Sequence, residues 1–322
     1  MEHPARPPRT RLRAHVLALL VVALAGCSGE LPPAADPGPL QQRPNPTTTL
    51  DLRLPPPLAA AVADGPRRPR TAAQAARQIV AAEQAIADPS TPRDVLATAG
   101  RLQQLAYREL GTRPGWDAAV ADRVPDRLRP VVDDNVAARR AFRSMHTRLG
   151  DTLPTWHIVP PAPAGRLRAF YRAAERRYGV GWEYLAAVNL VETGMGRIRG
   201  TSTAGAQGPM QFIPSTWDIY GDGDINDPRD AIMAAARFLD AHGFTEPGGV
   251  ARALYRYNNS DAYVRGVTHV ARVMERRPRT FLGYYHWQIF FLTNHGDVLL
   301  PEGYRAERPI PVERWLARNP QG

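Results

Sequence analysis

Two residue types are almost or wholly missing from this 322-residue sequence, and long apolar runs are missing as well. Cys27 is the only cysteine, so no disulfide can form within one chain. Lysine does not occur, and each of the 41 basic residues is therefore an arginine. The apolar run at residues 14–25 is shorter than the roughly 20 residues that a membrane-spanning helix needs. These absences exclude a scaffold held by intrachain disulfides and argue against a mature transmembrane helix at this run.

The charge balance is basic, with a formal net charge of +10 at pH 7. A basic surface suits anionic polymers or lipid head groups, but arginines scattered over solvated helix faces would give the same balance. Basic runs such as residues 67–70 contain no interleaved aromatic residues. We therefore expect no nucleic-acid partner.

The first 26 residues have the parts of a bacterial export signal. Arginines at positions 6, 9, 11 and 13 precede the apolar run 14–25. The run ends in Leu24-Ala25-Gly26-Cys27, which resembles the processing site of a lipoprotein. Lipidation explains both the position of Cys27 and its being the sole cysteine; the alternative is an ordinary secretory signal with an incidental cysteine. We expect residues 1–26 to be a lipoprotein signal peptide, and the mature protein to be extracytoplasmic and anchored to the bacterial cell membrane by a lipid on Cys27.

Two regions of different composition follow the signal. Residues 27–70 are rich in proline, alanine and arginine, which predicts a disordered tether. Residues 71–150 predict helices: Thr71 can cap the first, Thr91 with Pro92 begins a second that Gly111 can end, and a third apolar pattern runs over 128–149. The apolar stripes favour a core over a binding surface. We expect an accessory helical region there, packed on the domain that follows.

The stretch 181–217 is the most informative part of the chain. Leu185, Val188 and Glu192 share one face of a predicted helix, which Gly194 ends. A carboxylate on an apolar face at the C-terminal end of a helix is expected to have a raised pKa, because burial and the helix dipole both disfavour its charged form. A general acid that works near neutral pH needs such a pKa. The alternative is a glutamate that only caps the helix or forms a salt bridge there.

Three ordered motifs lie in and after this stretch. They are Glu192-Thr193, the segment GAQGPMQFIPST at residues 205–216, and Tyr257-Asn258. Over about residues 163–274 the chain resembles the transglycosylase SLT-type domains of the lysozyme superfamily, the lytic transglycosylases. The residues that follow Asn258, at positions 259–263, resemble the membrane-bound B-type branch of that family more.

The resemblance implies a mainly α fold: a lysozyme-like transglycosylase domain over 158–275, with the helical region before it and a C-terminal extension over 276–322. It implies that Glu192 is the catalytic acid of an enzyme that cleaves peptidoglycan glycan strands between N-acetylmuramic acid and N-acetylglucosamine and forms 1,6-anhydromuramic ends, without a cofactor. It implies that substrate is bound or oriented by Thr193, Gln207, Met210, Gln211, Tyr257 and Asn258. For Asn258, capping the break between two helices is an open alternative. Two other functions are open as well: a hydrolytic muramidase of the same fold, and a non-catalytic peptidoglycan-binding lipoprotein.

Two further segments bear on metal sites and on the extension. Asp222, Asp224 and Asn226 have the spacing of a calcium loop, but Asp227 and Met233 stand where that loop needs glycine and glutamate, so a complete EF-hand is excluded. A turn with Asp227 as the cap of the next helix is favoured. In the extension, apolar runs at 284–292 and 298–301 around a turn predict a β-hairpin. Its histidines have no partners at ligand spacing, so we expect no metal there.

Overall fold

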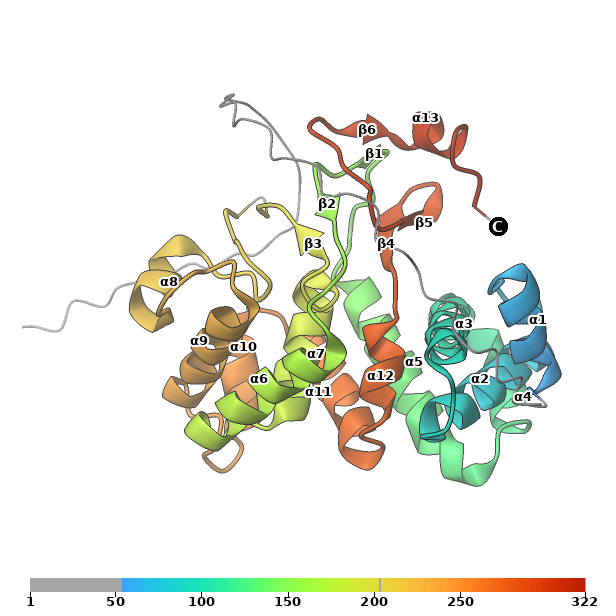
Figure 1. Ribbon diagram of the computed structural model, residues 1–322, viewed down its shortest axis with the longest axis horizontal. Coiled ribbons are helices and arrows are strands. Elements are labelled where there is room, and N and C mark those ends of the chain that lie inside the picture. Colours follow the sequence, from blue (N-terminus) through green and yellow to red (C-terminus); the bar gives the residue numbers. More distant parts are fainter. Residues whose placement is uncertain (1–53, 203, 322) are drawn as a thin grey trace, which may run out of the picture.

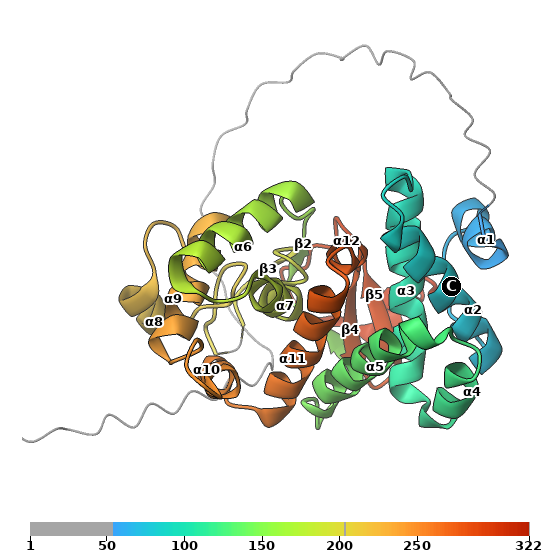
Figure 2. The ribbon, with the colours of Figure 1, turned by 90° about the horizontal axis from the view of Figure 1, so that it is seen from below.

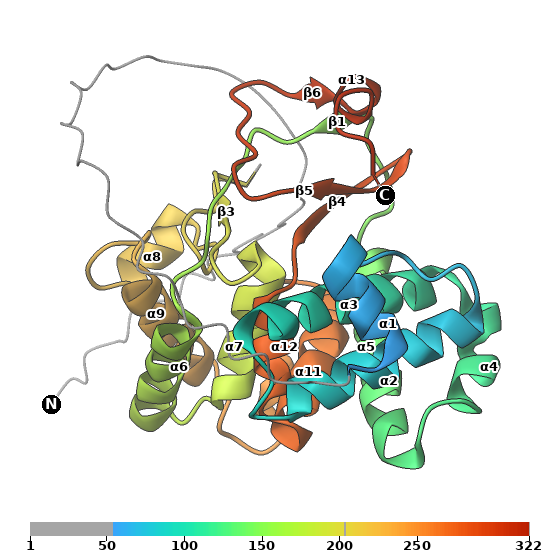
Figure 3. The same cartoon turned by 45° about the vertical axis from the view of Figure 1, so that its right-hand side comes forward.

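The computed structural model describes residues 54–202 and 204–321, and it is mainly helical, as the sequence predicted. Helices α1 to α4 lie on one side of the molecule and α6, α8, α9 and α10 on the other, with α7, α11 and α12 between them (Figure 1). Small two-stranded sheets gather along one edge of the helical body (Figures 1 and 3). Within the described residues, no helix is both long and apolar enough to cross a membrane.

The N-terminal helices are α1 (Pro56–Asp64), α2 (Ala72–Ala87), α3 (Arg93–Thr112), α4 (Asp117–Ala121) and α5 (Arg129–Ser144). The central helices are α6 (Ala164–Tyr178), α7 (Trp182–Thr193), α8 (Pro214–Tyr220), α9 (Pro228–Ala241), α10 (Gly249–Tyr257), α11 (Asp261–Arg276) and α12 (Thr280–Tyr285). The strands are β1 (Thr152–Leu153), β2 (His157–Ile158), β3 (Ile198–Arg199), β4 (Ile289–Thr293), β5 (Gly296–Leu300) and β6 (Ile310–Pro311), and a last helix is α13 (Val312–Leu316).

The predicted helical region at 71–150 is confirmed as helical, with errors at both ends of its second helix: α3 runs past Gly111 to Thr112, and the predicted cap at its start is not used. Thr71 caps α2, and its hydroxyl accepts a hydrogen bond from the Gln74 amide at 3.2 Å. Thr91 does not cap α3, which begins at Arg93 without a side-chain cap. Its hydroxyl donates instead to the Ala85 carbonyl at 2.7 Å, because the turn folds back onto the end of α2.

The prediction of a disordered tether is wrong for residues 54–70. This segment contains α1, whose Leu58 is fully buried and whose Ala61 is 4% exposed. Both pack with apolar residues of α2 and α3. The segment is rich in proline and arginine, but buried Leu58 and Ala61 suffice here because neighbouring helices supply the rest of the interface. Residues 1–53, with the predicted signal peptide, Cys27 and the first part of the tether, lie outside the described residues.

Helix α5 joins the N-terminal helices to the predicted catalytic domain, while two further apolar clusters lie among α1 to α5 themselves. Val131 and Ala138 of α5 belong to the same buried cluster as Leu185 and Val188 of α7. Helix α11 connects them, since it packs against both α5 and α7 (Figure 2). The region before residue 150 therefore packs directly, through α5, on the helices that carry Glu192 and its neighbours.

The predicted C-terminal hairpin is confirmed, with a shorter first strand than expected. Strands β4 and β5 pair antiparallel from Ile289 opposite Leu300 to Thr293 opposite Gly296. The residues before them, 280–285, form α12 and not a strand. The segment 152–158, between α5 and α6, contributes two short strands: β1 pairs with β6, and β2 pairs with β3. Buried Leu153 and Ile158 tie this segment to the hairpin in one small core.

Candidate active site

Glu192 is the penultimate residue of α7, where the sequence placed it. The helix is buried on several faces, because Leu185, Val188 and Asn189 are all fully buried. It ends at Gly194, whose φ of 60° is left-handed. A side chain here would be strained by the left-handed φ, and its Cβ would lie 2.4 Å from Ile289 Cδ1 of strand β4, so Ile289 would have to shift. The end of α7, and with it Glu192, is thus closely packed against the hairpin.

The Glu192 carboxyl group is half-buried and has one side-chain partner. The Tyr263 hydroxyl, from α11, donates a hydrogen bond to Glu192 Oε1 at 2.8 Å. The pKa of Glu192 is raised to about 7, mainly by burial, and the bond from Tyr263 opposes that rise. A carboxyl group with this pKa is protonated in a large fraction of molecules at neutral pH, which is the state that a general acid needs.

The tyrosine beside Glu192 is held in place by a second tyrosine. The rings of Tyr257 and Tyr263 stack with their planes 6° apart and their centroids 6.4 Å apart. The Tyr257 hydroxyl donates to the Met210 carbonyl at 2.7 Å. Burial raises the pKa of both phenols above their ordinary range, so both remain protonated donors at neutral pH.

A buried polar network fixes the loop of residues 205–216 to the end of α7. The Thr193 hydroxyl donates to the Pro209 carbonyl at 2.6 Å, and Asn189 Nδ2 donates to the same oxygen at 2.7 Å. The Tyr171 hydroxyl of α6 donates to Asn189 Oδ1 at 2.7 Å. A satisfied network of this kind holds the backbone in one arrangement. The loop is therefore a rigid neighbour of Glu192.

Two of the predicted substrate-binding residues have another role. Thr193 and Met210 are fully buried, so neither side chain is available to a sugar. We correct the prediction of direct contact for both. Thr193 joins α7 to the loop, and Met210 supplies the carbonyl that receives the Tyr257 hydroxyl. Both residues therefore support the site from the protein interior, without being exposed in it.

The other four predicted residues are half-buried. Two lie in the loop 205–216, and the other two lie at the end of α10, which Tyr257 connects to that loop. Gln207 pairs with Phe212 through both backbone groups, at 2.8 and 2.9 Å. Gln211 has a left-handed φ of 53°, and its Nε2 donates to the Gly208 carbonyl at 3.0 Å. Such a conformation is uncommon outside glycine and is often kept at functional sites. Tyr257 ends α10 and Asn258 follows it directly.

The Asn258 side chain does not cap the helix that follows it, which was the alternative to a role in substrate binding. The next helix, α11, is capped by Ser260, whose hydroxyl accepts from the Tyr263 amide at 3.3 Å. Asn258 contributes only backbone groups to the break: its amide bonds to Leu254 and its carbonyl accepts from Ser260. Within the described chain its side-chain amide has no recorded hydrogen bond, which leaves the group open to a ligand.

The loop at 222–230 forms the predicted helix-capping turn. The Asp227 carboxylate accepts from the amides of Arg229 at 2.8 Å and Asp230 at 3.1 Å. The loop also approaches the site loop closely, since a Cβ on Gly208 would lie 1.9 Å from the Ile225 carbonyl oxygen. In residues 54–202 and 204–321, no three histidine, cysteine or acidic side chains are grouped so that they could hold a metal ion.

Sequence reasoning missed two residues of the site. Asn189 lay within an apolar helix pattern, and a buried amide at that position could have signalled a polar network. Tyr263 lies near the start of α11, and no local sequence pattern identified Glu192 as its partner. Its role depends on the packing of α11 against α7.

Fold and site together describe a helical domain that presents one protonatable carboxylic acid beside a rigid, glycine-containing loop. The sequence profile of the Transglycosylase SLT domain matches residues 199–254, from β3 into α10. The chain therefore contains a Transglycosylase SLT domain, which implies a glycoside-cleaving enzyme family with peptidoglycan as its substrate. Glu192, Tyr257 and Asn258 lie just outside the matched residues. No solved structure matches the chain significantly.

Proposed function

We propose that the protein is a lytic transglycosylase that cleaves the β-1,4 bond between N-acetylmuramic acid and N-acetylglucosamine in peptidoglycan and leaves 1,6-anhydromuramic ends. The observation that carries this proposal is Glu192: a half-buried carboxylic acid with a pKa of about 7. It is joined through Thr193 to the loop that contains the SLT motif, at residues 205–216.

The reaction requires one group that first gives a proton and then takes one. Protonated Glu192 donates its proton to the glycosidic oxygen, and the bond from that oxygen to C1 of the muramic acid breaks. The substrate's own N-acetyl group can stabilise the cationic C1, so a second enzyme carboxylate is unnecessary. The Glu192 carboxylate then removes the proton from the C6 hydroxyl while that oxygen bonds to C1. Glu192 is thereby protonated again for the next cycle.

The half-buried polar residues around the acid are the proposed sugar contacts. Gln207, Gln211, Tyr257 and Asn258 carry amide or hydroxyl groups, which suit the hydroxyl and acetamido groups of a glycan. Gln211→Ala and Asn258→Ala should lower activity less than a change at Glu192, because these residues orient the substrate without transferring a proton.

Product analysis of peptidoglycan digested by the purified protein tests the proposal. Mass spectrometry should find anhydromuropeptides with the native chain. Glu192→Gln, which keeps the size of the side chain but cannot deliver a proton, should reduce their release by about a hundredfold or more. Reducing ends in place of anhydro ends would indicate the hydrolytic muramidase. Intact glycan binding without any release by the native chain would indicate a binding protein.

We also propose that the mature protein is extracytoplasmic and anchored to the membrane through a lipid on Cys27. The lipoprotein-like processing site at residues 24–27 supports this proposal. Cys27→Ala should release the protein from membranes or block its processing. Unchanged membrane fractionation together with an unchanged mass of the mature form would refute the anchor.

A further inference from the structure

Arg197, three residues after the turn that ends α7, is a charged side chain in a buried position. It is 5% exposed, and burial lowers its pKa from the ordinary value. Arg197 Nη1 donates to the Gly194 carbonyl at 3.1 Å, and Nη2 donates to the Tyr285 carbonyl at 2.6 Å. Its Nε lies 3.5 Å from Glu302 Oε1. A buried guanidinium is costly unless it is well bonded, so these contacts define one position for the turn at Gly194.

The partners of Arg197 come from the C-terminal extension, beyond the SLT match. Tyr285 ends α12, and Glu302 follows the hairpin β4–β5. The same extension supplies Ile289, whose side chain occupies the space where a residue other than glycine would carry its Cβ at position 194. The turn directly after Glu192 is thus held by polar contacts through Arg197 and by an apolar contact with Ile289, all from the C-terminal extension.

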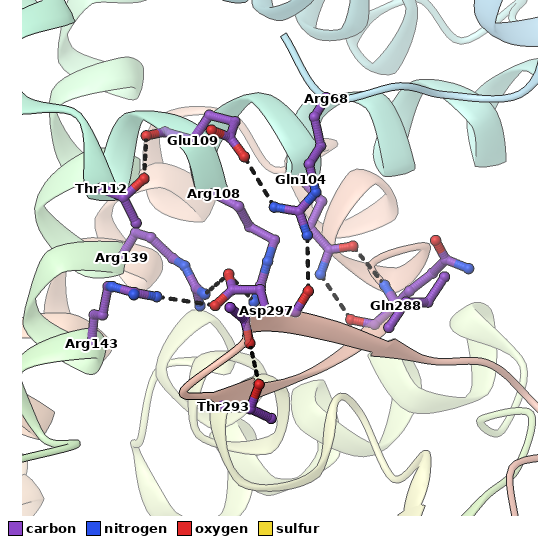
Figure 4. Close-up of polar contacts among 12 residues, drawn as sticks. Arg68, Gln104, Arg108, Glu109, Thr112, Arg139, Arg143, Gln288, Thr293 and Asp297 are labelled. Atoms are coloured by element: carbon purple, nitrogen blue, oxygen red, sulfur yellow. Dashed lines mark hydrogen bonds and ion pairs between the residues drawn. The ribbon is translucent and has the colours of Figure 1, made fainter. Parts of the chain in front are cut away.

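The far end of the hairpin is fastened to the N-terminal helices at Asp297. Its carboxylate bonds to Arg108 of α3 and lies 3.3 Å from Arg139 Nη2 and 3.0 Å from Arg143 Nη1 of α5 (Figure 4). Asp297 is a nearly buried side chain, and these three arginines lower its pKa against the opposing effect of burial. A carboxylate bonded to three guanidinium groups is a rigid joint.

Two further residues of the N-terminal region, Gln104 and Arg68, also hydrogen-bond to the backbone of the hairpin segment. Gln104 of α3 forms two hydrogen bonds with the backbone of Gln288 (Figure 4). Its Nε2 donates to the Gln288 carbonyl, and its Oε1 accepts from the Gln288 amide, each at 2.8 Å. Arg68, which precedes α2, donates to the Asp297 carbonyl at 3.1 Å. The start and the turn of the hairpin are therefore both fixed to residues that precede position 110.

We propose that Arg197 is a positioning residue for Glu192, and that the hairpin β4–β5, anchored at Asp297, is the frame against which it acts. This inference rests on the proposed function of Glu192. It gives the N-terminal helices a part in catalysis, although none of them contributes a group to the reaction.

The physical effect follows from the position of the turn. While Gly194 is held, the Glu192 carboxyl group stays at the half-buried end of α7 and its protonated form is favoured. When the turn loosens, water reaches the carboxyl group and stabilises its charged form, so its pKa falls toward the ordinary value of 4.5. The other titratable groups facing Glu192, Tyr257 and Tyr263, are phenols that remain protonated. The alkaline limb of the pH–rate profile then moves to lower pH.

The test compares Arg197→Met with Arg308→Met, which removes an exposed arginine of the same extension. Arg197→Met should lower kcat about tenfold to a hundredfold with KM within about twofold. It should also shift the alkaline limb down by about one pH unit. Arg308→Met should leave both unchanged, and Arg197→Lys should recover part of kcat. A loss of activity with an unshifted limb, or an equal effect at Arg308, would overturn the proposal.

Two additional measurements cover the remaining outcomes. Glu302→Gln removes only a partly exposed partner of Arg197, so it should fold even where Arg197→Met does not, and it should shift the limb in the same direction by less. The Glu192 carboxyl pKa, followed by carbon NMR of labelled protein, needs no turnover. If the pKa of Glu192 is lower in Arg197→Met than in the native chain, but the native chain has no lytic activity, the positioning role is supported and the proposed function is refuted. If the pKa of Glu192 is the same in both chains, the positioning role itself is refuted.

Discussion

The Tyr263 hydroxyl donates to Glu192 Oε1 across 71 positions of sequence, at 2.8 Å. This bond favours the charged form of Glu192, whereas burial favours the neutral form. Burial has the larger effect, which leaves the pKa at about 7. The two opposing contributions can be separated by mutation.

Tyr263→Phe should raise the pKa of Glu192 further, because it removes the contribution that lowers it. The alkaline limb of the pH–rate profile should therefore move to higher pH by about half a unit to one unit. Tyr255→Phe is the matched control, since Tyr255 is a 41% exposed tyrosine on α10. A limb that moves to lower pH in Tyr263→Phe would contradict this assignment.

The raised pKa of Glu192 also predicts how stability depends on pH. The folded-state pKa of about 7 lies above the ordinary value of 4.5, so the folded chain holds the Glu192 proton more tightly than the unfolded chain. The free energy of unfolding is therefore highest below about pH 4.5 and falls as pH rises through 7. Glutamine does not titrate. The stability of Glu192→Gln relative to the native chain should therefore grow by up to about 3 kcal/mol between pH 4.5 and pH 8. Urea unfolding of both chains at the two pH values measures this; a difference independent of pH would contradict it.

Asp297→Asn should destabilise the whole body. Removing one charge from the cluster leaves buried arginines without their counter-charge, which commonly costs about 3–5 kcal/mol. The loss should change little between low and high salt, because buried pairs are weakly screened. Thermal unfolding checks this, with the exposed Asp122→Asn as control. A change of less than about 1 kcal/mol would show that the cluster is an ordinary surface contact.

Helix α1 gives a sharp test of where the folded chain begins. Leu58→Ala should lower the free energy of unfolding by about 3 kcal/mol, because Leu58 is fully buried against α2 and α3. Val62→Ala on the same helix should cost less than about 1 kcal/mol, because Val62 is 42% exposed. Equal, negligible effects of the two changes in denaturant unfolding would restore the disordered tether that composition predicted.

Local signals in the sequence were sufficient for most helices and for the position of Glu192 at the end of α7. Thr71 and Asp227 cap the helices they were expected to cap, and Gly194 ends α7 in the left-handed conformation. These outcomes depend on residues within one or two turns, and such interactions are encoded by spacing. The motif at 205–216 was also readable, because its glycines and prolines act on their own backbone.

The tertiary structure decided what these elements meet. Tyr263 became the partner of Glu192 only because α11 packs on α7, and Asp297, in a segment that read as a turn, became the centre of an arginine cluster only because α3 and α5 approach the hairpin. Leu58 is buried by surfaces that α2 and α3 supply. The sequence by itself determined most of the helical segments and the position of Glu192 at the end of an apolar helix. The packing of distant segments decided the pKa of Glu192, its hydrogen-bond partner and the burial of Leu58, because burial and charge pairing depend on neighbours that are remote in sequence.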